Sequence, residues 1–432
     1  MLALRLKKLA KMDNKTFIVL RSFVVAIGAT AASTFIGVYG VLLGASAVEM
    51  GWLQSISNSV NNGGQLLWGR ISDRVGRRKP FLLLGGGVLG LLWFLLTYVR
   101  TPVELIIIYG VIALFSALIT VNWFSLIADS STVSTRGRFL SVINNLSSIG
   151  TIVSLVLMTF TFSGEVTSQI RIPFYLAASS YFISLVLIMS IKEQRRRNSG
   201  QKSLINTLRN LKSENRFFRY FMAMNVQGFF WSMAWPMFPI TIVSVMNFTL
   251  TDVAFLTVTS SLAALGSQFI LGKFVDRINR PPLIFANRIL LSLIPIQYAL
   301  YNSFGGFLIL ELYSGIVSSI QNVVMNSYLL DIVPEQGRGE YISLINGFNG
   351  IMYLFGALSG GYLLQYLLGF YDLREALLIG YIAVFFGRFM SSLLFIGLKE
   401  PEERRGLPLS LYNLILRRQP AGAPSGGTIR VR

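Results

Sequence analysis

The sequence contains no cysteine and no histidine among its 432 residues. Without cysteine the chain has no disulfide, no thiol nucleophile and no thiolate metal ligand. Without histidine it lacks the usual general base and the commonest metal ligand. These two absences argue against a conventional hydrolase or metalloenzyme, so we expect no enzyme activity, no metal and no cofactor. An ATP-driven pump is also not expected, because the GxxxxGK[ST] phosphate loop is missing.

Charge is scarce as well. Only 13% of the residues are charged, whereas a soluble protein usually carries about a quarter. Hydrophobic residues make up 53%, and Phe (32) and Gly (39) are abundant, as is usual in membrane helices. Twelve apolar spans have the length of roughly 20 residues that crosses a bilayer. They are expected at 17–43, 52–71, 80–99, 103–127, 138–160, 172–191, 217–243, 253–275, 283–301, 305–330, 340–367 and 375–397.

The net charge of +19 by itself would suggest nucleic acid, but the distribution of the charges argues otherwise. With the N-terminus inside, the cytoplasmic segments hold 32 Lys and Arg against 12 Asp and Glu. The external loops hold three basic residues and six acids. This bias is the positive-inside rule. It predicts a multi-pass protein of the cell membrane with both termini in the cytoplasm, in contact with membrane lipids and not with nucleic acid.

A hydrophilic segment at 192–216 separates six spans from six. Within it Leu204, Ile205, Leu208 and Leu211 recur at helical spacing, which predicts an amphipathic helix on the inner membrane surface. The expected domains are an N-terminal six-helix bundle (1–191), a cytoplasmic central loop (192–216), a C-terminal six-helix bundle (217–397) and a cytoplasmic tail (398–432).

The two sets of spans repeat one another. The segment Gly69–Lys79, here called the first charged loop, packs five basic residues and one acid into eleven positions. A looser copy, Gly272–Arg280, is the second charged loop, and it lies 203 residues further on. Two parallel six-helix halves with a binding site between them are the arrangement of a transporter.

The first charged loop resembles the signature G-x-x-x-D-[RK]-x-G-R-R-[RK] of the major facilitator superfamily, which lies between helices two and three. The resemblance covers residues 15 to 397. It implies an all-α integral membrane fold, with 12 transmembrane helices in two pseudo-symmetric six-helix bundles that rock about a central cavity. The function implied is secondary transport of a small-molecule substrate, a small organic solute, by alternating access. We expect a monomer.

In this family the charged loops are taken to hold the cytoplasmic gate shut in the outward-facing state. Physically, a carboxylate at the inner end of helix two can accept hydrogen bonds at a helix start or pair with an arginine. The alternative is that the cations only set topology. The gating motif that the resemblance implies comprises Gly69, Asp73, Arg74, Gly76, Arg77, Arg78, Asp129, Arg136, Gly272, Asp276, Arg277, Arg280, Asp331 and Arg338.

Polar side chains in apolar helices usually face a cavity or another helix. The span at 305–330 carries a polar stripe three or four residues apart, and the family's helices one, four, seven and ten line its cavity. Polar stripes on the second and fifth spans are read as helix packing. The substrate-cavity candidates are Glu311, Ser318, Asn322, Asn326, Gln227, Trp231, Thr120, Asn122 and Trp123.

Four charged residues lie inside spans. Arg21 and Arg288 are near the inner ends of their helices, and we expect them to extend to the interface. Arg388 lies deeper, and the sequence indicates no partner for it. Glu311 is the only carboxylate well inside a span, so we expect it to bind either a proton or a cationic part of the substrate.

The direction of transport stays open. Drug–proton antiporters of the superfamily often carry an acid in helix one and a G-x-x-x-G-P-x-x-G-G pattern in helix five. The first span here has no acid, and the fifth has no proline. A multidrug or metabolite efflux antiporter therefore remains an alternative to uptake, and uniport, symport and antiport are all open. A non-transporting, transporter-like receptor is a further alternative, although such a receptor usually carries a signalling domain or a long extension.

Overall fold

A computed structural model of the chain describes residues 13–130, 133–162, 169–191, 193, 215–274, 279–333 and 338–400. Within these ranges the regular secondary structure is helical throughout. The N-terminal half contains α2 (Asn14–Leu42), α3 (Ala47–Val75), α4 (Lys79–Leu96), α5 (Pro102–Asp129), α6 (Val133–Thr161) and α8 (Ile172–Ser190). The C-terminal half contains α10 (Asn215–Met233), α11 (Met237–Ile240), η1 (Thr241–Val245), α12 (Leu250–Phe274), α13 (Arg280–Ser292), α14 (Ile294–Leu300), α15 (Phe304–Ile320), η2 (Gln321–Met325), α16 (Asn326–Ile332), α17 (Arg338–Leu367), α18 (Leu373–Ser392) and η3 (Leu393–Phe395).

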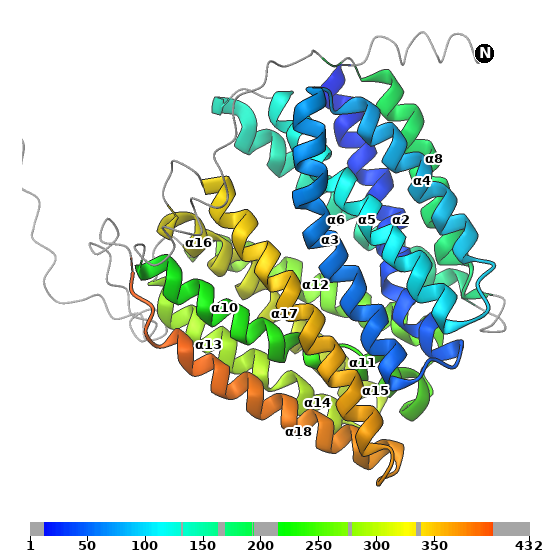
Figure 1. Cartoon of the computed structure of the whole chain (residues 1–432), viewed down its shortest axis with the longest axis vertical. Coiled ribbons are helices and arrows are strands. Elements are labelled where there is room, and N and C mark those ends of the chain that lie inside the picture. Colours follow the sequence, from blue (N-terminus) through cyan, green and yellow to red (C-terminus); the bar gives the residue numbers. More distant parts are fainter. Residues whose placement is uncertain are drawn as a thin grey trace, which may run out of the picture.

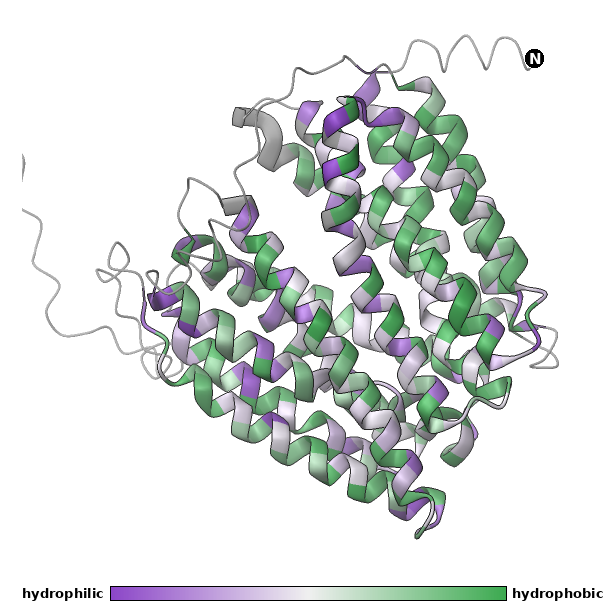
Figure 2. Ribbon diagram, in the orientation of Figure 1, coloured by the Kyte–Doolittle hydropathy of each residue, from purple (hydrophilic) through white to green (hydrophobic). Residues whose placement is uncertain are grey.

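The helices confirm an all-α membrane fold. Eleven segments in the described residues are long and apolar enough to cross a bilayer. The remaining predicted span is α3, which has 29 residues but a more polar composition. Figure 2 shows the difference, since α3 is mixed in colour where α4 and α8 are mostly apolar. Three of the predicted spans are interrupted: one is divided at 234–236, one at Leu293, and one by the π-helical η2.

Local sequence signals place the helix ends at the first charged loop and at the loops that precede α3 and α5. Ser46 with Glu49, and Thr101 with Glu104, form reciprocal capping boxes at the starts of α3 and α5. Gly76 ends α3 in the left-handed conformation, with φ of 68°. That conformation costs an L side chain roughly 1–2 kcal/mol. The glycine of the charged loop is therefore explained by the turn that it makes.

The helices form two bundles, one built from α2 to α8 and the other from α10 to α18 (Figure 1). The bundles meet chiefly along α3 and α17, and along α6 and α12. Gly51 and Gly361 bring the α3 and α17 backbones together, because a Cβ on Gly361 would lie 3.1 Å from the Cα of Gly51. Ser59 donates a hydrogen bond of 2.6 Å to the carbonyl of Gly350 across the same interface.

Further along α3 the bundles diverge. A Cβ at Gly63 would have no neighbour within 4 Å, and one at Gly69 would meet Val121 of its own bundle. In Figure 1 the ends of α3 and α5 at the first charged loop lie apart from α10 and α16. The two bundles are therefore in backbone contact at the start of α3 and apart at its end, which is called the open end below. The amphipathic helix predicted within 192–216, and the tail beyond 400, lie outside the described residues.

Candidate functional site

The first charged loop is held to the end of α8 by Glu193. The carboxylate of Glu193 accepts hydrogen bonds from the backbone N–H groups of Arg78 and Lys79, the latter at 3.0 Å. These N–H groups begin α4 and have no partner within the helix. The ammonium of Lys79 in turn donates to the carbonyls of Met189 (2.6 Å) and Ile191 (2.7 Å) at the end of α8. The N-terminal end of α4 and the C-terminal end of α8 are thus joined, because Glu193 binds the first and Lys79 binds the second.

The second charged loop repeats this arrangement. Glu400 accepts a hydrogen bond of 2.9 Å from the backbone N–H of Arg280 at the start of α13. The guanidinium of Arg280 forms an ion pair with Asp331. Sequence reasoning missed Glu193 and Glu400. A signal was available, because each acid closely follows the last span of its half.

The remaining charged residues of the predicted gating motif fall into three groups. Arg74, Arg77 and Asp129 are exposed at the open end of the N-terminal bundle. Arg78 donates a 2.8 Å hydrogen bond to the hydroxyl of Ser72 in its own half. The third group lies outside the described structure, and it comprises the side chains of Asp73, Arg136 and Arg338 and the whole of 276–277. The gating role stays a prediction.

A cavity of about 310 Å³ lies within the N-terminal bundle, lined by residues of α2, α5, α6 and α8. Two of the predicted cavity residues, Thr120 and Trp123, line it. Asn122 does not, because it is fully buried and donates a 2.8 Å hydrogen bond to the carbonyl of Leu118. Sequence reasoning missed three groups that line the cavity: Arg21, Tyr181 and the polar pair Asn144 and Ser147.

The expectation that Arg21 and Arg288 extend to the interface is wrong. Arg21 is 2% exposed and Arg288 is 1% exposed. Arg21 stacks on the ring of Trp123 at 3.8 Å. Arg288 lies against the sulfur of Met325 and over the ring of Phe395 at 5.6 Å. Both side chains point into a bundle because of the rotation of their helices, which distance from the helix end does not predict.

Arg388 has partners that the sequence could not indicate. It donates hydrogen bonds to the carbonyls of Phe230 (3.3 Å), Trp231 (2.6 Å) and Leu291 (3.2 Å). These carbonyls belong to the last turns of α10 and α13, where the helices break and helical partners run out. Because no water is available in the bilayer core, a side chain must satisfy them.

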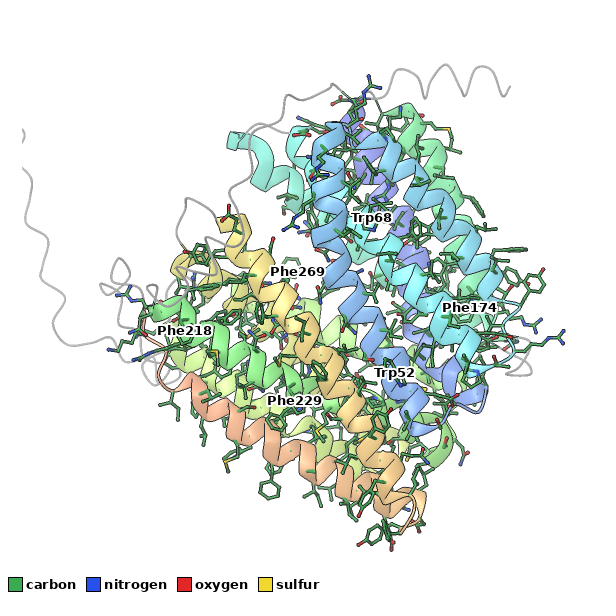
Figure 3. The ribbon with its side chains drawn as sticks, viewed as in Figure 1. Trp52, Trp68, Phe174, Phe218, Phe229 and Phe269 are labelled. Atoms are coloured by element: carbon green, nitrogen blue, oxygen red, sulfur yellow. The ribbon has the colours of Figure 1, made fainter. Side chains whose placement is uncertain are left out.

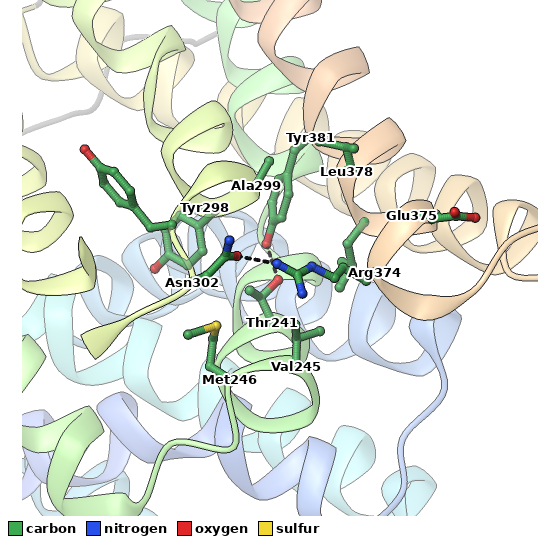
Figure 4. A pocket seen from close by; sticks show the side chains of 12 residues that line it. Thr241, Val245, Met246, Tyr298, Ala299, Asn302, Arg374, Glu375, Leu378 and Tyr381 are labelled. Atoms are coloured by element: carbon green, nitrogen blue, oxygen red, sulfur yellow. Dashed lines mark hydrogen bonds between the residues drawn. The ribbon is translucent and has the colours of Figure 1, made fainter. Parts of the chain in front are cut away.

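Glu311 is a residue of α15, and its side chain lies between α12 and α14. Tyr298 donates to its carboxylate at 3.4 Å. One turn further, Gly315 lets α15 approach α12 so closely that a Cβ would lie 2.3 Å from the carbonyl of Ser260. The ring of Tyr298 also lines a second cavity of about 190 Å³ (Figure 4). In that cavity Thr241 and Tyr381 hydrogen-bond at 2.6 Å, and Arg374 donates to Asn302 at 2.6 Å.

The other predicted cavity residues of the C-terminal half are divided. Asn322 and Asn326 are exposed and Ser318 is half-buried. Trp231 belongs to an aromatic cluster, with its ring 5.7 Å from that of Trp235. Gln227 is 1% exposed and accepts a 3.3 Å hydrogen bond from Ser391 of α18, so its amide points toward a neighbouring helix.

Aromatic side chains also fix α3 in its own bundle. The indole N–H of Trp68 donates to the carbonyl of Leu114 on α5 at 3.0 Å (Figure 3). In the same bundle Phe174 of α8 stacks on Trp93 of α4, with the ring centroids 5.9 Å apart. The N-terminal bundle therefore has its own internal contacts, independent of the contact between α3 and α17.

Comparison with known proteins agrees with this architecture. A profile of the Major Facilitator Superfamily matches residues 18–224 and 220–423. An uncharacterized MFS-type transporter of Methanocaldococcus jannaschii is 21% identical over 371 residues, which cover 82% of this chain and 92% of that protein.

Solved structures share the fold at low sequence identity. The nucleoside transporter NupG superposes with a TM-score of 0.70 at 14% identity, covering 89% of this chain and 99% of that one. An inward-facing bacterial homolog of the human lysosomal transporter Spinster gives 0.68 at 12% identity, covering 91% and 100%. The family resemblance and the all-α membrane fold expected from the sequence are confirmed. Because the profile spans nearly the whole chain in two slightly overlapping matches, this protein belongs to the Major Facilitator Superfamily of membrane transporters.

Proposed function

We propose that this chain moves a small organic solute across the cell membrane by alternating access, with both termini in the cytoplasm. One observation carries the proposal: the bundles pack backbone to backbone at the start of α3 and separate toward its end. In the orientation expected from the charge distribution, the open end is cytoplasmic. The state described is then inward-open, and rocking about the α3–α17 contact would close it and open the outer side.

The chain is well suited to a direct test, because it has no native cysteine to remove. Spin labels on Val75→Cys and Leu330→Cys report the distance between the inner ends of the two bundles. Labels on Arg100→Cys and Gly369→Cys report the outer ends. Alternating access predicts two populations for each pair, with opposite changes when a transported solute is added. A single fixed distance for both pairs, in lipid and with solutes that liposomes take up, would contradict the mechanism.

The charged loops act as the cytoplasmic gate within this proposal. Two features support it. The loops lie at the open end, and each is anchored by an acid to its own half, so it moves with its bundle. Asp73→Asn is the test, with Asp252→Asn, which removes an acid at the other end, as its control. Loss of gating should shift the inner-end label distances toward the open state. Unchanged distances together with unchanged transport would contradict a gating role of the charged loops.

The solute site comprises Thr120 and Trp123 of one half and Ser318, Asn322 and Trp231 of the other. Coupling to protons is assigned to Glu311, because Tyr298 connects its carboxylate to the cavity in Figure 4, at the predicted outer end. Glu311→Gln should abolish the pH dependence of uptake by liposomes. Retention of both pH dependence and solute affinity in that variant would remove Glu311 from the mechanism.

A further inference from the structure

The cavity of the N-terminal bundle contains a buried cation that has no carboxylate partner in the described part of the chain. The guanidinium of Arg21 is 2% exposed and lines the cavity. Its Nε donates a 3.1 Å hydrogen bond to the hydroxyl of Ser184. Its Nη2 is buried and has no acceptor within the described residues. None of the residues that line the cavity is acidic.

This situation is costly unless something pairs with the charge. Burying a charged side chain within a membrane-spanning bundle is costly, and such side chains usually pair with a group of opposite charge or with backbone carbonyls. The buried guanidinium of Arg388 donates hydrogen bonds to three backbone carbonyls, whereas that of Arg21 contacts one neutral hydroxyl and the face of Trp123. Arg21 also differs from Arg388 in opening onto a cavity, where a ligand has room to bind.

The cavity wall has the composition of a binding pocket for an amphiphile. Its volume of about 310 Å³ is within the range of small-molecule sites. Apolar side chains, Ile119, Ile127 and Leu140 among them, form much of the wall. Polar groups from Thr120, Asn144, Ser147 and Tyr181 are set among them. An apolar body with one charged end matches this combination.

We propose that Arg21 binds the oxyanion of the solute, a carboxylate or phosphate ester attached to an aromatic or aliphatic body. Ser184 holds the Nε and Trp123 covers one face of the guanidinium plane, which leaves the buried Nη2 as the donor that still lacks an acceptor. The inference rests on the proposed function, because it names the chemical class of the solute at one part of that site.

Binding to the purified full-length chain tests the inference without requiring transport. The probes are 3-phenylpropionate, phenyl phosphate and the neutral 3-phenylpropanamide, and the readout is the melting temperature. The acids should raise the melting temperature and the amide should not. Arg21→Gln should weaken acid binding about 10- to 100-fold, the equivalent of losing a hydrogen bond to a charged group, and Arg21→Lys should retain part of it. Arg100→Gln, in an exposed loop, should bind as the parent does.

A ligand-free comparison keeps the test decisive. Arg21→Gln should melt no lower than the parent, because it removes an unpaired buried charge, while Arg388→Gln should melt clearly lower. An equal drop in both variants would make Arg21 structural and overturn the proposal. So would equal binding of acid and amide, or no rise with either acid. Binding of dihexanoyl phosphatidylglycerol without binding of the small acids would overturn it too, by assigning the site to lipid. The label distances described above test alternating access separately, so either idea can fail alone.

Discussion

Replacing Gly361 by alanine should open the molecule on the side that is now closed. Gly361 of α17 faces α3, and a Cβ there would lie 2.6 Å from the carbonyl oxygen of Ala47 and 3.1 Å from the Cα of Gly51. Both atoms belong to the backbone of the other bundle and cannot rotate away. The two bundles must therefore separate by several tenths of an ångström at this point, or tilt about it.

The magnitude follows from the cost of overpacking, which is typically about 1–3 kcal/mol per added group. The clash exists only while α3 and α17 are in contact, so the whole cost falls on the state in which this end of the molecule is closed. An energy difference of this size changes a two-state ratio roughly 5- to 150-fold. Alanine also favours the helix by about 1 kcal/mol over glycine, but that gain is present in both states and cancels.

The assay is the distance distribution between the paired spin labels at each end of the bundles. In Gly361→Ala the Arg100–Gly369 pair should move apart and the Val75–Leu330 pair should approach. Gly63→Ala, also on α3 but with no neighbour within 4 Å of its Cβ, should leave both distributions unchanged. Gly360→Ala should lower stability without moving them, because its Cβ would meet Met233 of the same bundle. Distributions in Gly361→Ala identical to those of the parent would refute the view that this contact closes the outer side.

Three further variants test single structural assignments. Arg388→Gln should destabilise the protein by about 3 kcal/mol, since buried carbonyls without donors cost about 1–3 kcal/mol, and a denaturation midpoint will measure the loss. Glu193→Gln should lower the stability by about 1 kcal/mol, because it weakens the charged cap on α4. The measurement is the melting temperature, and Glu104→Gln, in the capping box of α5, is the comparison. Gly76→Ala should cost about 1–2 kcal/mol because of its left-handed backbone, and a change no larger than that of Gly272→Ala, in open space, would contradict the turn assignment.

The sequence predicted the architecture well because length and hydropathy are local properties. Each span must satisfy its own backbone in the bilayer, so a run of apolar residues already implies a helix. The breaks in those helices were less visible. The interruption after Met233 precedes Pro236, and that at Leu293 precedes Pro295, so a breaker is present in both. The side chain that satisfies the carbonyls at these breaks could not be predicted from the sequence, because Arg388 lies 97 residues from Leu291 and 157 from Trp231.

The candidate site was predicted only in part for the same reason. Thr120 and Trp123 follow from the helix that carries them, and the structure places both at the cavity. Arg21 depends on how α2 is rotated against α5 and α8, which is a property of packing and not of position along the helix. Glu193 and Arg78 are 115 residues apart in the chain. No local pattern connects them, although their counterparts Glu400 and Arg280 repeat the arrangement.

Some features of the N-terminal half recur in the C-terminal half, and others do not. The acids that cap α4 and α13 occur in both halves, as do the glycines and charges around them, which fits parts that both bundles need in order to rock as units. The buried charges at the cavities do not repeat. The offset of 203 residues relates Arg21 to Met224, and the offset of 202 that relates Arg136 to Arg338 pairs Glu311 with Tyr109. Because burying a charge is costly in every state, a charge kept in one half alone needs a reason other than the common mechanism. We propose that this reason is recognition of the solute or of its coupling ion, with Arg21 supplying the cation and Glu311 the carboxylate.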